Sequence, residues 1–168
     1  MEGAIRNRVD ESGIISLALG DLVENNVLDF DLHNYLWEGL VLREKPFRDA
    51  LKELEEADFQ GRSIALFCSS DAVIPDWAWM LVTSRLTLLQ ATVWIGTPGD
   101  VKSQMLLANI ESMDVTSFVD ARIVIKGCSE AGGPNALGQI IRKLQPVARS
   151  IMYGEPCSTV PIYKQPKA

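Results

Sequence analysis

The sequence predicts an α/β fold of three layers, in which Rossmann-like βαβ units build a mostly parallel sheet of four or five strands. Two observations predict it. Short apolar runs of strand length alternate with helical patterns between residues 62 and 157, and this order is typical of parallel strands joined by crossover helices. The first of these runs also lacks strict alternation of polar and apolar residues, as expected for a strand covered on both faces.

Four apolar runs are predicted to be the strands of this sheet, namely residues 63–68, 91–95, 121–125 and 151–153. The segments between them place apolar residues three and four positions apart, which is the helical period. Their inner faces are predicted to carry Trp77, Met80, Leu81, Ser84 and Leu88 in the first helix, Val101, Met105, Ala108 and Ile110 in the second, and Leu137, Ile140, Ile141 and Leu144 in the third. Residues 159–163 are expected to form an edge strand, because Pro161 cannot donate to a central ladder.

The first sixty residues lack this alternation. They contain a candidate strand at 13–19, a short helix at 31–37 that Asp29 or Asp31 could cap, and a helix at 46–56. No linker rich in Pro, Gly or Ser separates them from the rest. We therefore predict a single domain over residues 1–168, in which residues 1–60 are an N-terminal elaboration packed on the βαβ core of residues 61–168.

Composition and charge limit the classes of function. The chain has 168 residues, of which 47% are hydrophobic, and this is enough for a self-sufficient core. Its net charge of -6 disfavours nonspecific binding of polyphosphates. The densest basic group, Arg142, Lys143 and Arg149, is typical of one solvated helix face. We therefore expect no nucleic-acid partner.

Two segments bear on location. Residues 1–8 have no apolar stretch of the kind that a secretory signal needs. The longest apolar stretch, residues 78–89, is interrupted by polar residues and is too short to span a bilayer. We expect a cytoplasmic protein without a membrane partner. Because that compartment is reducing, the three cysteines are expected to be free thiols or metal ligands.

The cysteines form the most informative pattern in the chain. Cys68, Cys128 and Cys157 each follow or close a predicted strand. If those strands are parallel, all three sulfurs lie along the edge where open α/β folds build their sites. Zinc prefers tetrahedral thiolate or imidazole ligands, and a carboxylate can complete the set. We predict a zinc site of Cys68, Cys128 and Cys157, with Asp71 or water in the fourth position.

Other interpretations stay open, and so does the question whether the chain is an enzyme. Buried free cysteines are common, so the three thiols could simply pack in a non-catalytic interaction domain that needs no cofactor. Cys128 could instead be the nucleophile of a redox or acyl-transfer enzyme, since it precedes a predicted helix N-terminus. Asp71 is a candidate general base. The partner of an interaction domain is open, and one option is a second copy of this chain.

Several strings resemble a known family. They are CSSDAVIPDWA at 68–78, IKGC at 125–128 and SIMYGEPCSTVPIYK at 150–164, together with LWEGL at 36–40 and the stretch 45–51. They resemble, over nearly the whole chain, a bacterial family catalogued only as domain of unknown function 2480. The resemblance implies a family label and no catalytic residues. In that family a histidine often precedes the first cysteine, whereas this chain has Phe67, so a metal ligand at that position would be missing here.

Overall fold

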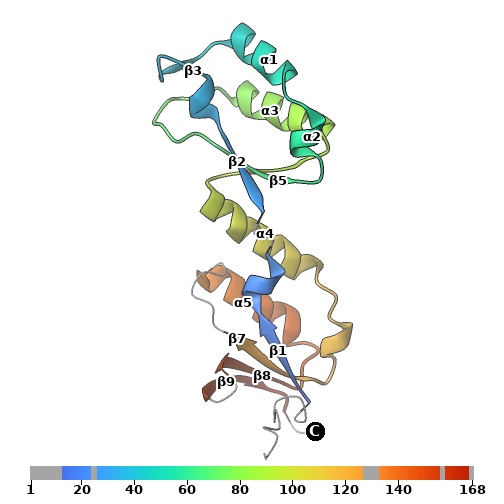
Figure 1. The fold of residues 1–168 in the computed structure, drawn as a ribbon. Coiled ribbons are helices and arrows are strands. Elements are labelled where there is room, and N and C mark those ends of the chain that lie inside the picture. The colour runs from blue at the N-terminus through green and yellow to red at the C-terminus, as the bar shows by residue number, and fades with distance from the viewer. Residues whose placement is uncertain (1–12, 24–25, 127–132, 156–157, 167–168) are drawn as a thin grey trace, which may run out of the picture. The chain divides into compact units, whose positions relative to one another are not determined.

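The computed structural model describes residues 13–23, 26–126, 133–155 and 158–166 (Figure 1). The chain divides into two compact units, one of residues 24–102 and the other of residues 1–23 with 103–168. We describe each unit by itself. That residues 1–168 form a single domain stays a prediction.

The unit of residues 24–102 contains a parallel sheet of three strands in the order β2-β5-β6. They are β2 (Val27–Asp31), β5 (Ser63–Phe67) and β6 (Thr92–Ile95), and β5 pairs with both neighbours. Between β2 and β5 the chain forms the 3-10 turn Leu32–Tyr35, the short antiparallel pair β3 (Leu36–Trp37) and β4 (Val41–Leu42), and helices α1 (Glu44–Lys52) and α2 (Glu56–Phe59). Helix α3 (Asp76–Leu88) connects β5 to β6.

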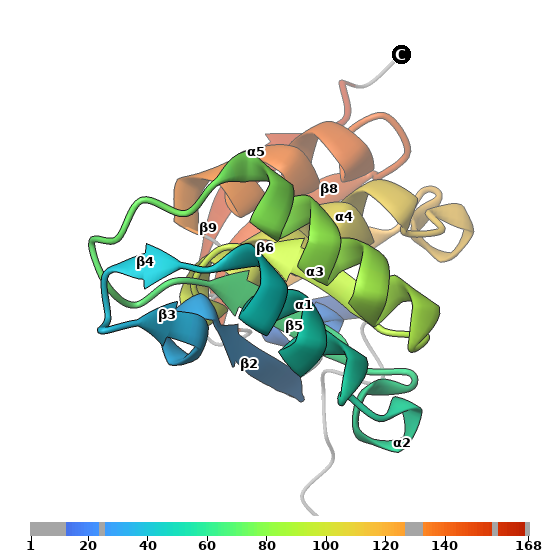
Figure 2. The ribbon, with the colours of Figure 1, turned by 90° about the horizontal axis from the view of Figure 1, so that it is seen from above.

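Helices α1 and α3 cover the same face of this sheet in both views (Figures 1 and 2). The core between them includes Phe30 of β2 and Leu32 just after it, Ile64 and Leu66 of β5, Phe47 and Leu51 of α1, and Ala78, Val82 and Leu86 of α3. In β5, Ser63 and Ala65 on the alternate positions are buried as well. A strand with both faces buried needs no polar alternation, which explains its sequence pattern.

The face that α3 buries differs from the predicted one. Ala78, Val82 and Leu86 are fully buried, whereas Met80 and Leu88 of the predicted inner face are 72% and 71% exposed. Apolar residues occur all around this helix, so their spacing fits more than one face. The small side chain of Ala78 then allows close approach to the sheet, while the larger side chains of Trp77 and Trp79 pack beside it.

The second unit contains a sheet of four strands in the order β1-β7-β8-β9. Strands β1 (Ile14–Ala18), β7 (Arg122–Lys126) and β8 (Ser150–Glu155) are parallel, and β9 (Ser158–Lys164) is antiparallel to β8. Its helices are α5 (Gly133–Leu144) and most of α4 (Pro98–Ser112), with 3-10 turns at Leu19–Leu22 and Thr116–Phe118. The core joins Leu106 and Ile110 of α4, Ala136, Ile140 and Leu144 of α5, and Ile123, Ile125 and Ile151 of the sheet.

The α/β class and the parallel pairing are confirmed, and all four predicted strands exist as β5, β6, β7 and β8. Hydrogen bonding pairs β5 with β6 in one unit and β7 with β8 in the other, and the three-layer arrangement around one sheet stays a prediction. The first sixty residues supply a parallel strand to each sheet, β1 beside β7 and β2 beside β5. The predicted edge strand is β9, where Pro161 lies. Within the described parts of the chain, no helix has both the length and the apolar content that crossing a membrane requires.

The side chain of Arg85 in α3 fastens the end of α1. Its guanidinium donates to the carbonyl oxygens of Leu51 at 2.9 Å, Lys52 at 3.2 Å and Leu54 at 2.7 Å. The last carbonyls of a helix lack partners within the helix, and a cation there also opposes the negative end of the helix dipole. Arg85 therefore stabilises the contact between α1 and α3.

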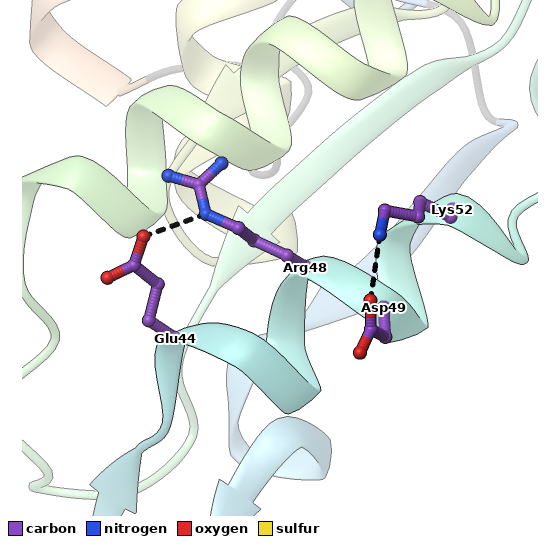
Figure 3. Close-up of polar contacts among 4 residues, drawn as sticks. All are labelled: Glu44, Arg48, Asp49 and Lys52. Atoms are coloured by element: carbon purple, nitrogen blue, oxygen red, sulfur yellow. Dashed lines mark hydrogen bonds and ion pairs between the residues drawn. The ribbon is translucent and has the colours of Figure 1, made fainter.

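The ion pairs along α1 are of a different kind (Figure 3). Glu44 pairs with Arg48 and Asp49 with Lys52, each at 2.8 Å, on the outer surface of the helix. The two side chains of the first pair are 49% and 61% exposed, so water and salt screen their attraction. These pairs contribute little to stability.

We expect Arg85→Ala to lower the free energy of unfolding by about 2 kcal/mol, because three carbonyls lose a charged donor. Arg85→Lys should lie between wild type and Arg85→Ala, since an ammonium lacks the planar fork of a guanidinium. The matched control is Arg48→Ala on α1, with an expected loss below about 0.5 kcal/mol. Urea unfolding followed by circular dichroism measures all three; equal losses for Arg85→Ala and Arg48→Ala would contradict this assignment.

Candidate functional site

The carboxyl ends of β7 and β8 lie side by side. The two strands are parallel neighbours, in register from Arg122 opposite Ser150 to Ile125 opposite Tyr153. Cys128 comes two residues after the end of β7, and Cys157 comes two residues after the end of β8. Both cysteines lie outside the described residues. The structure thus brings together the strand ends that precede them.

The hairpin between β8 and β9 contains Cys157 in its connection. Glu155 pairs with Ser158, so only residues 156 and 157 connect the two strands. Just before this pair, Gly154 has a φ of +124°. A Cβ atom at Gly154 would lie 2.5 Å from the carbonyl oxygen of Ser158. The close approach of the two strands therefore requires glycine at this position.

Cys68 and Asp71 belong to the unit of residues 24–102 and lie after the end of β5. Cys68 is half-buried and packs against the apolar core of that unit, and its Sγ lies 3.4 Å from the Oγ of Ser70. Asp71 is exposed in the loop that leads to α3. The packing of Cys68 is a structural role that needs no metal.

Asp31, at the end of β2, ties the same loop to the sheet. Its Oδ1 accepts hydrogen bonds from the backbone N–H of His33 at 2.9 Å and from that of Ser69 at 3.0 Å. It caps the 3-10 turn that follows, as one of the two predicted candidates. Partial burial raises the pKa of Asp31, but the hydrogen bonds from Ser69 and His33 outweigh this and leave the pKa below its usual 3.8.

The described part of the chain holds no group of three or more His, Cys, Asp or Glu side chains that could bind a metal ion. Of the four predicted zinc ligands, only Cys68 and Asp71 are in that part. Cys128 and Cys157 belong to the other unit, outside the described residues. The four-residue zinc site stays a prediction.

A second feature was missed by sequence reasoning. At the amino ends of β7 and β8, Arg122, Arg149 and Lys164 line an open cavity of about 720 Å³. Arg149 is close in the chain to Arg142 and Lys143 of α5, but the cations that line the cavity with it come from β7 and β9. The strand register is the signal that would have found them, since it places residue 122 opposite 150 and 150 opposite 164.

The family model described as "Protein of unknown function (DUF2480)" matches residues 3–165. No curated protein and no solved structure matches the chain.

We expect Asp31→Ala to lower the free energy of unfolding by about 1 kcal/mol at pH 7, because a cap and the bond to the Ser69 amide are lost. Since folding lowers the pKa of Asp31 below 3.8, its charge stabilises the protein above that pH, and this contribution disappears as the pH falls through the folded-state pKa. Asp31→Asn keeps an acceptor oxygen without the charge, so its difference from wild type should shrink below about pH 4. Urea titrations between pH 3 and 7 measure this, with Asp29→Asn on the same strand as control. A difference that does not change with pH would contradict the charge assignment.

Gly154→Ala should destabilise the β8–β9 hairpin, because alanine is strained at positive φ and its Cβ would meet the backbone of Ser158. We expect a loss of about 2 kcal/mol or more in the free energy of unfolding. Gly20→Ala is the control, since nothing lies within 4 Å of a Cβ built there and its φ is not positive. Similar losses in both variants would show that the hairpin does not depend on glycine.

Proposed function

The chain belongs to the DUF2480 family, and we propose that it binds zinc through the thiolates of Cys128 and Cys157 at the carboxyl edge of the β1-β7-β8-β9 sheet. The observation that supports this is the parallel, in-register pairing of β7 with β8. Each cysteine follows its strand by two residues, on neighbouring strands of one edge. That edge is where open parallel sheets place their binding groups.

The reach of the chain is compatible with a shared metal. Two residues of extended chain span at most about 7 Å, and neighbouring strands lie about 5 Å apart. Two thiolates on one zinc need their sulfurs about 4 Å from each other, because each Zn–S bond is about 2.3 Å long. The pairing of Ile125 with Tyr153 near these strand ends therefore supports a metal shared by the two cysteines.

Two thiolates leave two positions of a tetrahedral zinc to fill. The candidates from the sequence are Cys68 and Asp71, or water. Two further thiolates or carboxylates would make a closed structural site, whereas a water would leave an open position where a substrate could bind. Cys68 could instead serve only to pack the core. The contact of its side chain with the apolar core after β5 favours this alternative.

We expect untagged protein purified without chelators to contain close to one zinc per chain by inductively coupled plasma mass spectrometry. Cys128→Ser and Cys157→Ser should each reduce this at least tenfold, because two-thiolate coordination is lost. Ser158→Ala, next to Cys157 and exposed, is the control for damage to the hairpin and should retain the metal.

Cys68→Ser and Asp71→Asn decide the remaining positions. Loss of zinc in either variant identifies a ligand, and full retention in Cys68→Ser leaves that cysteine with packing alone. Wild-type zinc far below one per chain would overturn the proposal. In that case, rapid alkylation of Cys128 by iodoacetamide at pH 7, faster than that of a model thiol, would favour the reactive-thiol alternative.

A further inference from the structure

The amino end of the four-stranded sheet carries a row of residues in register. Ile14 lies opposite Arg122, Arg122 opposite Ser150, and Ser150 opposite Lys164. Paired residues on neighbouring strands project their side chains from the same face of a sheet. The next row, with Ile123 and Ile151, belongs to the core under the helices. The row with Arg122 therefore lies on the face away from that core.

A cavity of about 720 Å³ lies along this row. Three cations line it: Arg122 from β7, Arg149 just before β8, and Lys164 from the end of β9. Among the residues that the structure describes, none of the three takes part in an ion pair. Arg48 and Lys52 of α1 differ in this respect, since both have carboxylate partners on the same helix (Figure 3).

The charge in the cavity suits a doubly charged anion. Among the described residues that line it, three cations and the carboxylate of Asp120 leave a formal charge of 3 − 1 = +2. A phosphate monoester carries about −1.5 to −2 at neutral pH. Arginine also matches phosphate better than a single ammonium does, because its planar fork donates two parallel hydrogen bonds. A single carboxylate would neutralise only half of this charge.

The remaining lining of the cavity is largely apolar. Ile14, Met152 and Pro161 contribute carbon surface beside the charged groups, and Ser150 and Gln165 add polar atoms. The volume of about 720 Å³ lies within the range of small-molecule sites. A ligand with an apolar group attached to its phosphate would cover this surface, whereas free phosphate would leave it exposed to water.

We propose that this cavity binds a small organic phosphate monoester, with Arg122, Arg149 and Lys164 holding the phosphate and Ile14, Met152 and Pro161 contacting the organic group. The proposal is independent of the zinc site. It concerns the opposite end of the same strands and uses no cysteine.

The test uses phenyl phosphate as the probe, with inorganic phosphate and benzoate as comparisons, in isothermal titration calorimetry and ¹H–¹⁵N correlation spectra of the full chain. We expect saturable binding of phenyl phosphate with a Kd of about 1 mM or tighter. Inorganic phosphate should bind more weakly because it lacks the apolar group, and benzoate at least about tenfold more weakly because it carries one charge. Backbone signals of Arg122, Ser150 and Lys164 should shift on titration.

Arg122→Gln and Lys164→Gln should each weaken phenyl phosphate binding at least about tenfold, since each removes a charged donor. Arg122→Lys keeps the charge without the fork and should fall between wild type and Arg122→Gln. Arg142→Gln on α5 is the matched control, because it removes the same charge from an exposed arginine that does not line this cavity. Thermal unfolding of each variant establishes that it is folded.

Three results would overturn the proposal. The first is a lack of saturable binding of phenyl phosphate to the wild type. The second is an equal effect of Arg142→Gln and Arg122→Gln, which would mean that only the overall charge matters. The third is equal affinity for phenyl phosphate and either inorganic phosphate or benzoate, which would remove the role of the apolar surface or that of the second charge.

Discussion

The in-register pairing of β7 with β1 and β8 is the constraint on which the candidate sites depend. It joins three segments far apart in sequence, and it sets which residues share a face. Ile15, Ile123 and Ile151 pack in the core, while Ile14, Arg122 and Ser150 lie on the other face. A shift of one residue would exchange the two rows and place the Arg122 guanidinium in the apolar core. The free-energy cost of burying that charge therefore disfavours the shifted register. The observed register in turn brings Arg122 and Lys164 to the same end of the sheet.

The two ends of these parallel strands favour different chemistry. The carboxyl ends of β7 and β8 lead into connections of six and two residues, in which Cys128 and Cys157 stand. At the amino ends, residues 122 and 164 are themselves paired within the sheet. Their backbones are therefore fixed at the spacing of the strands before a ligand binds, so little conformational freedom is lost on binding. Lys164 reaches this end only because β9 is antiparallel to β8.

Local pattern was enough to predict the α/β class and strands β1 and β5 to β9, and it named Asp31 as one of two candidate caps, because each depends on a few neighbouring residues. It did not predict β2. It was not enough for the buried face of α3. There the apolar residues surround the helix, and the close approach that Ala78 permits selects the face. Local pattern also could not predict the strand order, because pairing between strands depends on residues far apart in the sequence. The cations of the cavity were missed for the same reason, because residues 122, 149 and 164 come together only when the strands pair.

The basic cavity also refines what a net charge of -6 excludes. Overall charge acts on a ligand at long range and is screened beyond about 8 Å at physiological ionic strength. A long polyanion extends over many such lengths and is subject to the overall acidic charge, and the absence of a nucleic-acid partner stays a prediction. A phosphate monoester fits within one screening length of Arg122, Arg149 and Lys164 and responds mainly to them. An acidic chain can therefore hold a small dianion while repelling a large one.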